Sequence, residues 1–295
     1  MKSTNYAYRI FQVFNVLVMI GIVIATLYPF IHIISMSLSE EKYVFSGQVK
    51  ILPKGLSLQS YKMIFGHPSF IRSYINSIYY TVLFVIVSLA MTSLTAYPLS
   101  KDKLPGCKFL KKMVMFTMLF SGGMIPSFLL VKSLHMYNSV WAITLPGAVA
   151  AYYVMIMITY FKSLPEELME AASIDGLGEF RIFTDIVLPL SKPIMATMVL
   201  FFAVAQWNNW FAPLIYFSKD SKYPVILLLR NLLFNAQKIA TDSKTLEELM
   251  KAQQQGTGEG IKYSAIVLTT LPFLMVYPFA QKYFVQGMLI GSVKG

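Results

Sequence analysis

Charged residues are scarce in this sequence of 295 residues: Asp, Glu, Lys and Arg together make up 13% of it. Soluble domains carry roughly 25% of charged residues and about 45–50% of apolar ones. Here 56% of the residues are hydrophobic, and the mean hydropathy is +0.58. This composition excludes a soluble enzyme, a disordered chain and a fibrous protein, and it indicates a protein of the lipid bilayer.

Residues that usually hold metals are also few. Cys107 is the single cysteine, so an internal disulfide and a cysteine-based zinc site are excluded. The three histidines, His32, His67 and His135, lie far apart in the sequence, which is more typical of interfacial or packed side chains than of a metal site. We therefore expect no metal and no resident cofactor on this chain.

Motifs for nucleotide binding and catalysis are missing as well. The sequence contains no G-x-x-x-x-G-K-[ST] phosphate-binding loop. It also offers no paired-carboxylate, Ser-His-Asp or metal-ligand constellation. We therefore expect a chain that is not an enzyme and has no ATPase site of its own.

Long uncharged runs are what the sequence has in abundance. Because a charge at the bilayer centre costs at least ~2.5–3.5 kcal/mol, such runs mark membrane spans. The runs show no strict alternation, which favours helices over an outer-membrane barrel. Six transmembrane helices in an all-α membrane protein are predicted, near residues 12–36, 71–98, 112–131, 140–161, 194–217 and 262–282.

Helix-breaking residues occur inside two of these spans, at Pro126 and at Pro146-Gly147. Neighbouring helices can satisfy the backbone groups that such residues leave free. The first span resembles a signal peptide in its basic start, but its apolar run is too long, and Tyr28-Pro29-Phe30 stands where small residues would be cleaved. A retained anchor is therefore the better interpretation of this span, and a cleaved signal peptide is the alternative.

Acidic residues avoid the predicted spans, and all 14 lie outside them. Proton- and sodium-coupled carriers commonly place a carboxylate inside the membrane. The distribution therefore disfavours an ATP-independent secondary sugar carrier or channel. This class stays the alternative, because a carrier can use backbone carbonyls instead.

Basic residues give the chain a net charge of +11 but are scattered between the apolar runs. They form no basic stripe, which favours contact with anionic lipid head groups over binding of nucleic acid. The densest lysine cluster would be cytoplasmic if the N-terminus is cytoplasmic. Its members are Lys101, Lys103, Lys108, Lys111 and Lys112.

The segment 162–193, between the fourth and fifth predicted spans, is rich in polar residues. Ser163 and Glu166 have the spacing of a capping box, so a short helix is predicted from there to about Ile174. Asp175-Gly176 ends this helix, because glycine accepts the left-handed conformation of a helix terminus.

A second short helix is predicted at about 178–187. In it, three apolar residues would lie along one stripe: Phe180, Phe183 and Val187. Pro189 and Pro193 would separate this helix from the fifth span. Together the two helices predict a compact hairpin that projects from the membrane and suits a cleft on a soluble partner.

The same segment carries Glu170-Ala171-Ala172, Gly176 and Ile186-Val187-Leu188-Pro189 at the spacing of the EAA loop. In this loop the sequence resembles the permeases of ATP-binding-cassette (ABC) importers. The resemblance implies the type I ABC importer permease fold, with a cytoplasmic coupling helix that docks on a separate ATPase and with both termini cytoplasmic. It implies coupling roles for Glu170, Ala171, Ala172, Asp175, Gly176, Ile186, Leu188 and Pro189.

Further stretches resemble carbohydrate permeases of the maltose-transporter second-subunit type. They are Ile51–Ser57, Trp207–Leu214, Tyr277–Gly287 and Gly291–Gly295. The ending is similar to a subgroup from Gram-positive bacteria that is associated with complex oligosaccharides, including uronate-containing or pectin-derived ones. The resemblance implies an oligosaccharide importer in the bacterial cytoplasmic membrane. Its partners would be a homologous second permease, two ABC ATPase subunits that bind ATP and Mg, and an extracellular sugar-binding lipoprotein.

These expectations divide the chain into a cytoplasmic N-terminus (1–11), a permease domain (12–282) and a cytoplasmic tail (283–295). Inside the permease domain lie the EAA loop (162–193) and an outer loop (218–261). By the same resemblance, Gly287–Gly295 at the end of the tail would touch the ATPase dimer.

The fifth span contains an unusually polar and aromatic stretch for the middle of a membrane. Aromatic faces and amide groups are suited to binding sugars, so this stretch is a candidate lining of the translocation path. An interhelical polar clamp to the partner permease is the alternative. The residues are Gln206, Trp207, Asn208, Asn209 and Trp210.

The outer loop begins with the apolar run Val225–Leu229, for which an interfacial position is expected. Farther on, it contains a tip rich in Gln and Gly, with Gln253, Gln254, Gln255 and Gly256. The resemblance implies that such a tip reaches into the sugar-binding protein and helps to displace the sugar. A disordered loop is the alternative.

Overall fold

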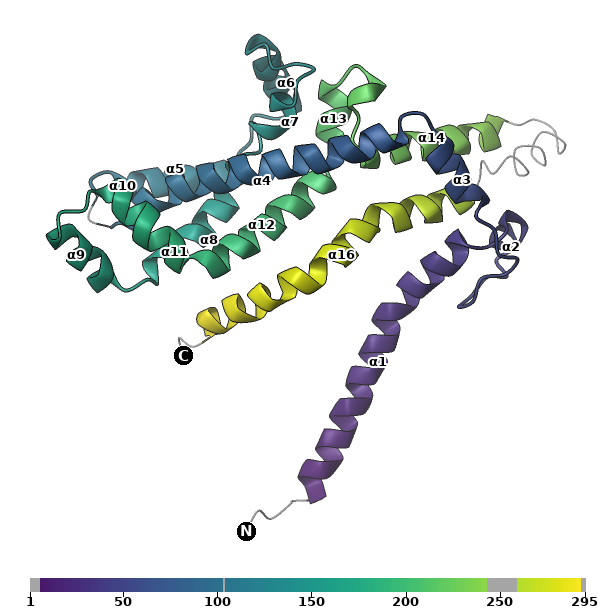
Figure 1. Ribbon diagram of the computed structural model, residues 1–295, viewed down its shortest axis with the longest axis horizontal. Coiled ribbons are helices and arrows are strands. Elements are labelled where there is room, and N and C mark those ends of the chain that lie inside the picture. Colours follow the sequence, from purple (N-terminus) through teal and green to yellow (C-terminus); the bar gives the residue numbers. More distant parts are fainter. Residues whose placement is uncertain (1–5, 103, 243–258, 293–295) are drawn as a thin grey trace. The chain divides into compact units, whose positions relative to one another are not determined.

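The computed structural model describes residues 6–102, 104–242 and 259–292, with the backbone alone at residues 7, 235–242 and 276–292. Within these ranges the chain is helical, apart from an isolated bridge between Ser39 and Leu56. The prediction of an all-α protein is confirmed for this part of the chain (Figure 1).

The longer helices are α1 (Tyr6–Ser37), α4 (Phe70–Ser100), α5 (Cys107–Leu119), α6 (Met124–Ser133), α8 (Ala151–Lys162), α12 (Lys192–Trp207), α14 (Val225–Asp242) and α16 (Glu259–Ser292). The shorter ones are α2 (Glu41–Phe45), α3 (Gln59–Gly66), α7 (Trp141–Thr144), α9 (Glu166–Ile174), α10 (Glu179–Arg181), α11 (Leu188–Leu190) and α13 (Phe211–Tyr216). A π-helical turn, η1, covers Ile182–Val187, and a 3₁₀ turn, η2, covers Asp220–Lys222.

Two of the predicted spans are unbroken helices that are long and apolar enough to cross a membrane, Tyr8–Ser37 in α1 and Phe70–Ser100 in α4. Each results from a continuous apolar run without a central charge. Two further candidates within the described residues are bent pairs. In one, α5 and α6 meet at 114°, and in the other, Glu179–Leu190 and Lys192–Trp207 meet at 81°.

Three of the predicted spans are not single helices, so the prediction of unbroken helices there is wrong. The third span breaks at residues 120–123, the fourth at 145–150 and the fifth at 208–210. Proline and glycine explain the first two breaks. Pro126 is tolerated only in the first turn of α6, because its ring blocks the preceding helical turn, and Pro146-Gly147 interrupts the fourth span in the same way. The sixth predicted span lies within α16.

The described residues form two compact units, one within 1–70 and 229–272 and the other within 71–228 and 273–295. In the first unit, serines at the end of α1 hold the neighbouring segments. The Lys54 N–H donates to Ser39 Oγ (3.0 Å), and the Tyr61 hydroxyl donates to Ser37 Oγ (2.8 Å). Ser264 of α16 donates to the Ser37 carbonyl (3.3 Å).

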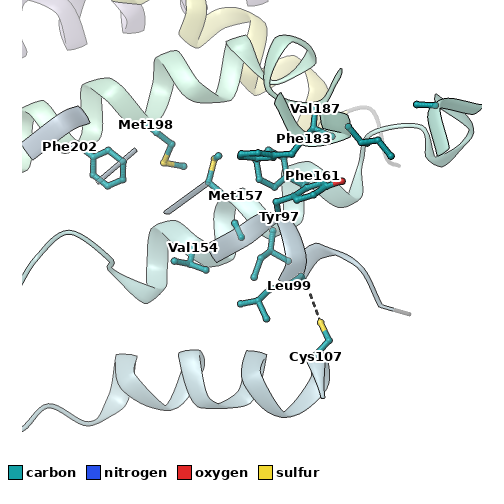
Figure 2. Close-up of a cluster of buried hydrophobic side chains, with 14 of the residues drawn as sticks. Tyr97, Leu99, Cys107, Val154, Met157, Phe161, Phe183, Val187, Met198 and Phe202 are labelled. Carbon is teal, nitrogen blue, oxygen red and sulfur yellow. Dashed lines mark hydrogen bonds between the residues drawn. The ribbon is translucent and has the colours of Figure 1, made fainter. Parts of the chain in front are cut away.

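The second unit has its main core where α4, α8, α12 and the EAA loop meet. Figure 2 shows Phe161, Met157, Phe183 and Met198 directed toward one another from these elements, beside Tyr97. Within this unit, α9 and α10 gather at the Ser100 end of α4, whereas α13 lies nearer its other half (Figure 1).

The run Val225–Leu229, for which an interfacial position is expected, packs against protein. This run begins α14, and both Val225 and Leu227 are fully buried in the protein. The Val225 N–H donates to Ser77 Oγ of α4 (2.8 Å), so this end of α14 packs against protein.

Candidate functional site

The EAA loop begins with α9, which ends at Ile174 as predicted. Gly176 follows with φ of +83°, a left-handed conformation that glycine adopts without a Cβ clash. Two hydrogen bonds close the turn, from Leu177 N–H to Ala172 O (3.0 Å) and from Gly176 N–H to Ser173 O (3.1 Å). This pattern is a Schellman motif, and it confirms that Asp175-Gly176 ends the helix.

The predicted capping box at the start of α9 is wrong. The Ser163 hydroxyl donates backward to the Tyr160 carbonyl (2.7 Å) and thereby completes the end of α8. Pro165, not Ser163, is the N-cap residue of α9. Its φ of −60° and ψ of 120° are extended, which sets the entry of the chain into the helix without a side-chain cap.

We call α9 the first arm of the EAA loop and the segment Glu179–Leu190 its second arm. The helix of the second arm is wider than the predicted α-helix. After α10 the backbone forms the π-turn η1 and then continues through Pro189 to Leu190. Proline has no N–H and its ring clashes with the carbonyl four residues earlier, which here belongs to Asp185. A locally widened π-turn accommodates both effects, and the bend follows at Ser191.

The predicted apolar stripe of the second arm is confirmed for two of its three residues and wrong for the third. Phe183 and Val187 are buried in the core, whereas Phe180 is 70% exposed. Ala172 of α9 is buried in the same cluster, and Ile186 and Leu188 pack partly against it. The EAA loop is thus anchored on one side by apolar residues from both of its arms (Figure 2).

The other side of the loop is open. Glu170, Ala171, Asp175, Gly176 and Pro189 are exposed there. Three apolar side chains are also exposed and give this surface an apolar character that the sequence analysis missed: Leu168, Ile174 and Phe180. Ile174, at 86% exposure, could have been found from its place next to the helix-ending Asp175-Gly176.

Two groups of ion pairs lie beside the loop. Lys101 pairs with Glu179, whose carboxylate also accepts a hydrogen bond from the Tyr97 hydroxyl (3.0 Å). The carboxylate of Asp102 accepts hydrogen bonds from Lys111 (2.7 Å) and Lys162 (2.6 Å). In the sequence alone, the cluster that contains Lys101 and Lys111 indicates only topology.

The ion pairs shift the pKa of both carboxyl groups downward. Hydrogen bonds from Lys111 and then Lys162 lower the pKa of Asp102 to about 2. The hydrogen bond from Lys101 is the main cause of the lowered pKa of Glu179. Both groups are therefore ionised at neutral pH, in line with the charge-stabilising effect of nearby ammonium groups.

A second feature is a cavity of about 490 Å³ in the unit that contains residues 71–228. Its wall comes from the broken parts of three predicted spans and from Phe84 of α4. The polar lining residues are Ser121, Ser127, Gln206, Asn209 and Tyr216. Among the described residues, those that line the cavity include no Lys, Arg, Asp, Glu or His.

Asn209 organises the break between α12 and α13. Its amide nitrogen donates to Gln206 Oε1 (3.4 Å), and its side-chain oxygen accepts the Ala212 N–H (3.2 Å) at the start of α13. The structure thus brings Gln206 and Asn209 together at the cavity wall.

The other members of the candidate path lie elsewhere. Trp207 is buried between the rings of Tyr74 and Phe273, with centroids 5.7 and 5.8 Å away. Asn208 is exposed and donates to the Val204 carbonyl (2.9 Å). Trp210 packs edge to face on Phe211 (5.4 Å).

The candidate binding-protein loop, Gln253, Gln254, Gln255 and Gly256, lies outside the described residues. Over the part of the chain that the structure describes, no three His, Cys, Asp or Glu side chains gather as metal ligands would.

Known proteins are similar to this chain over nearly its whole length. The family model described as binding-protein-dependent transport system inner membrane component matches residues 5–290. Protein LplC of Bacillus subtilis (strain 168) is 43% identical over 287 residues, which are 97% of this chain and 96% of that protein. The polygalacturonan/rhamnogalacturonan transport system permease protein YtcP of the same organism is 41% identical over 267 residues, covering 90% of this chain and 92% of that protein.

A solved structure is also similar. It is the crystal structure of a bacterial ABC transporter involved in the import of the acidic polysaccharide alginate, and one of its chains matches with a TM-score of 0.80 at 30% sequence identity. The match covers 96% of this chain and 100% of the other.

Proposed function

This chain belongs to the family of binding-protein-dependent transport system inner membrane components, and we propose that it is one of two permease subunits in an ATP-driven importer of an oligosaccharide. The observation that carries the proposal is the EAA loop. It is anchored on the core by residues of both arms and presents an exposed tip around Gly176. An anchored loop with an open, partly apolar tip has the properties of a docking element for a soluble subunit.

In the proposed importer the chain crosses the bacterial cytoplasmic membrane six times, with both termini in the cytoplasm. The broken pairs α5–α6, α7–α8 and α12–α13 each count as one span. Two separate ATPase subunits bind ATP and Mg and move the EAA loop. Only a ligand with different affinities for two states can shift the balance between them, and ATP at the ATPase interface supplies that difference.

The cavity at the helix breaks is proposed as this chain's part of the translocation path. Discontinuous helices that meet at a polar site are typical of transport proteins, because irregular backbone is tolerated where it lines a cavity. Gln206 and Asn209 offer amide donors and acceptors for sugar hydroxyls. Trp207, Asn208 and Trp210 lie outside the cavity wall. We assign them a structural role in stabilising the break between α12 and α13.

The class of substrate follows from the relatives. Polygalacturonan/rhamnogalacturonan appears in the name of YtcP, and the solved transporter is involved in alginate import. Both are polysaccharides that contain uronic acids. We therefore propose an oligosaccharide as the substrate, and the experiment compares an acidic class with a neutral one. A secondary carrier is not favoured, because the family is that of binding-protein-dependent transport systems and the similar solved structure is that of an ABC transporter.

A strain that lacks this gene, compared with its parent, tests the proposal. Uptake of labelled oligogalacturonides and of neutral arabino-oligosaccharides is measured in both. We expect one class to lose uptake in the deletion strain and to regain it with the gene on a plasmid. Unchanged uptake of every oligosaccharide, with loss of uptake of a non-carbohydrate, would contradict the proposal.

A further inference from the structure

Lys101 and Asp102 are neighbours in the turn after α4 and carry opposite charges. Lys101 pairs with Glu179, the first residue of α10. Asp102 accepts two hydrogen bonds from Lys162, the last residue of α8, at 2.6 and 2.8 Å. Lys162 precedes α9 and Glu179 follows it, so one pair of adjacent residues holds both arms of the EAA loop. We call the two pairs, Lys101 with Glu179 and Asp102 with Lys162, the grip.

Each of these contacts is reinforced by a second one. Lys111 of α5 donates to Asp102 Oδ1 (2.7 Å), which fixes the carboxylate between two helices. Tyr97 of α4 donates to the Glu179 carboxylate (3.0 Å), and the Lys101 ammonium lies 4.8 Å from the centre of the Tyr97 ring. The grip therefore has a defined geometry instead of resting on one flexible ion pair.

The helix that ends at this grip is α4, which runs without a break for 31 residues. At 1.5 Å per residue its length is about 46 Å. Phe84 of α4 lines the cavity. Near the opposite end, Asn76 donates to the Ser221 carbonyl (2.9 Å) and the Tyr80 hydroxyl to the Lys222 carbonyl (3.0 Å).

We propose that Lys101 and Asp102 are positioning residues that transmit displacement of the EAA loop to α4, and through α4 to the cavity and the segment around Ser221. α4 is continuous over its whole length, with Pro98 in its last turn, and a continuous helix can move as one element. By contrast, α5–α6 and α12–α13 are interrupted and can absorb a displacement in their breaks. The inference rests on the proposed function, because it assigns how the EAA loop of that importer acts on its own chain.

The ion pairs of the grip can be removed by mutation without unfolding the chain. Glu179 and Asp102 are largely exposed at their side chains, and exposed ion pairs add little to folding stability. Glu179→Gln and Asp102→Asn therefore remove the charge and keep the shape. Glu259→Gln is the matched control, because it removes an exposed pair with Lys262 (3.5 Å) at the start of α16.

The test uses the whole purified transporter, with its partner permease and ATPases, in lipid nanodiscs. A fluorophore is attached to the thiol that an Arg72→Cys substitution introduces in the exposed first turn of α4. The native Cys107 is buried and does not compete for the label. The ATP-driven change in fluorescence and the rate of ATP hydrolysis are recorded together.

We expect Glu179→Gln and Asp102→Asn each to reduce the ATP-driven fluorescence change about fivefold or more, within the usual range of coupling between sites. ATP hydrolysis should stay within about twofold of wild type, and Glu259→Gln should change neither. The exchange Lys101→Glu with Glu179→Lys should restore the signal, whereas a merely structural role would lower ATP hydrolysis and the fluorescence change together.

A full fluorescence change in both single variants would overturn the inference, and so would a loss that the charge exchange fails to restore. A wild-type complex that hydrolyses ATP without an ATP-driven change at residue 72 would also overturn the inference, whereas a wild-type complex that hydrolyses no ATP would instead overturn the proposed function. The two failures are therefore distinguishable.

Discussion

At Gly176 the backbone turns with φ of +83°, and a Cβ built there meets no atom of the chain within 4 Å. The position is thus open in space but restricted in conformation. Left-handed backbone costs a residue with a side chain roughly 1–2 kcal/mol, and Asn and Asp tolerate it better than most. The space in front of Gly176 is therefore available to a partner surface.

Replacing Gly176 by Asp should uncouple transport, because a charged side chain would enter the proposed contact with the ATPase. Gly176→Asn is the matched variant, since it has the same shape and a similar backbone tolerance without the charge. We expect uptake per ATP hydrolysed to fall about tenfold or more in the Asp variant and less in the Asn variant. Normal uptake by Gly176→Asp would contradict the assignment of the tip.

Asn209 is the second residue whose role can be tested by mutation. Asn209→Leu removes the amide from the cavity wall and the cap of α13, so uptake should fall about tenfold. Asn208→Leu is the control, because Asn208 is exposed and outside the wall. The measurement is initial uptake rate against sugar concentration. Equal effects of the two substitutions would count against a path at this cavity.

Asp102 should stay charged across the pH range of any transport assay. Its pKa is lowered from 3.8 to about 2 by Lys111 and Lys162. The stabilisation is complete above the unfolded pKa and is lost only as the pH falls through about 2. We therefore expect Asp102→Asn to change the ATP-driven signal at residue 72 by the same factor at pH values of about 5 and 8. A titration between these values that Asp102→Asn abolishes would contradict this.

At the scale of elements, the sequence predicts long helices well and their interruptions badly. α1 and α4 follow from unbroken apolar runs, and the end of α9 follows from Gly176. The breaks do not follow, because hydropathy adds up side chains and carries no information about backbone continuity. Glycine and proline are tolerated in membrane helices when neighbours satisfy the backbone, so their presence alone does not place a break.

The same limit applies to the candidate sites. Gln206 and Asn209 line the cavity while Trp207 packs away from it, because successive side chains of a helix such as α12 point in different directions. The grip on the EAA loop joins residues 60 and 78 positions apart. No local pattern reports such pairs, and they become visible only when α4, α8 and α10 are in place.

The π-turn gives a prediction for the second arm. Pro189→Ala restores an N–H that can bond to the Asp185 carbonyl, which should tighten η1 toward an α-helix and rotate Phe183 out of the core. We expect poorer assembly with the ATPase, measured as the amount that copurifies, falling several-fold in line with a core residue lost. Pro165→Ala is the control, because Pro165 precedes α9 and blocks no helical bond. Equal assembly in both variants would contradict this reading.

At the scale of the whole molecule, this chain has the features expected of one subunit of a larger transporter. It carries a loop with an exposed tip, a neutral cavity at the helix breaks and a long helix that connects the two regions. The sequence contains no phosphate-binding loop. Its membership in the permease family was predictable from the EAA spacing, because those residues are local in sequence. The identity of the sugar was not, because the cavity wall offers no charged group to select it.

The central claim is that this chain works only with separate ATPase and permease subunits. Purification of a tagged copy from its native membrane in mild detergent, with mass spectrometry and an ATPase assay of the same sample, tests it directly. The account predicts recovery of a second permease of the same family and an ABC ATPase, with ATP hydrolysis that a sugar-binding lipoprotein stimulates. Recovery of the chain alone or as a homo-oligomer without ATPase activity, yet competent for sugar transport, would contradict it.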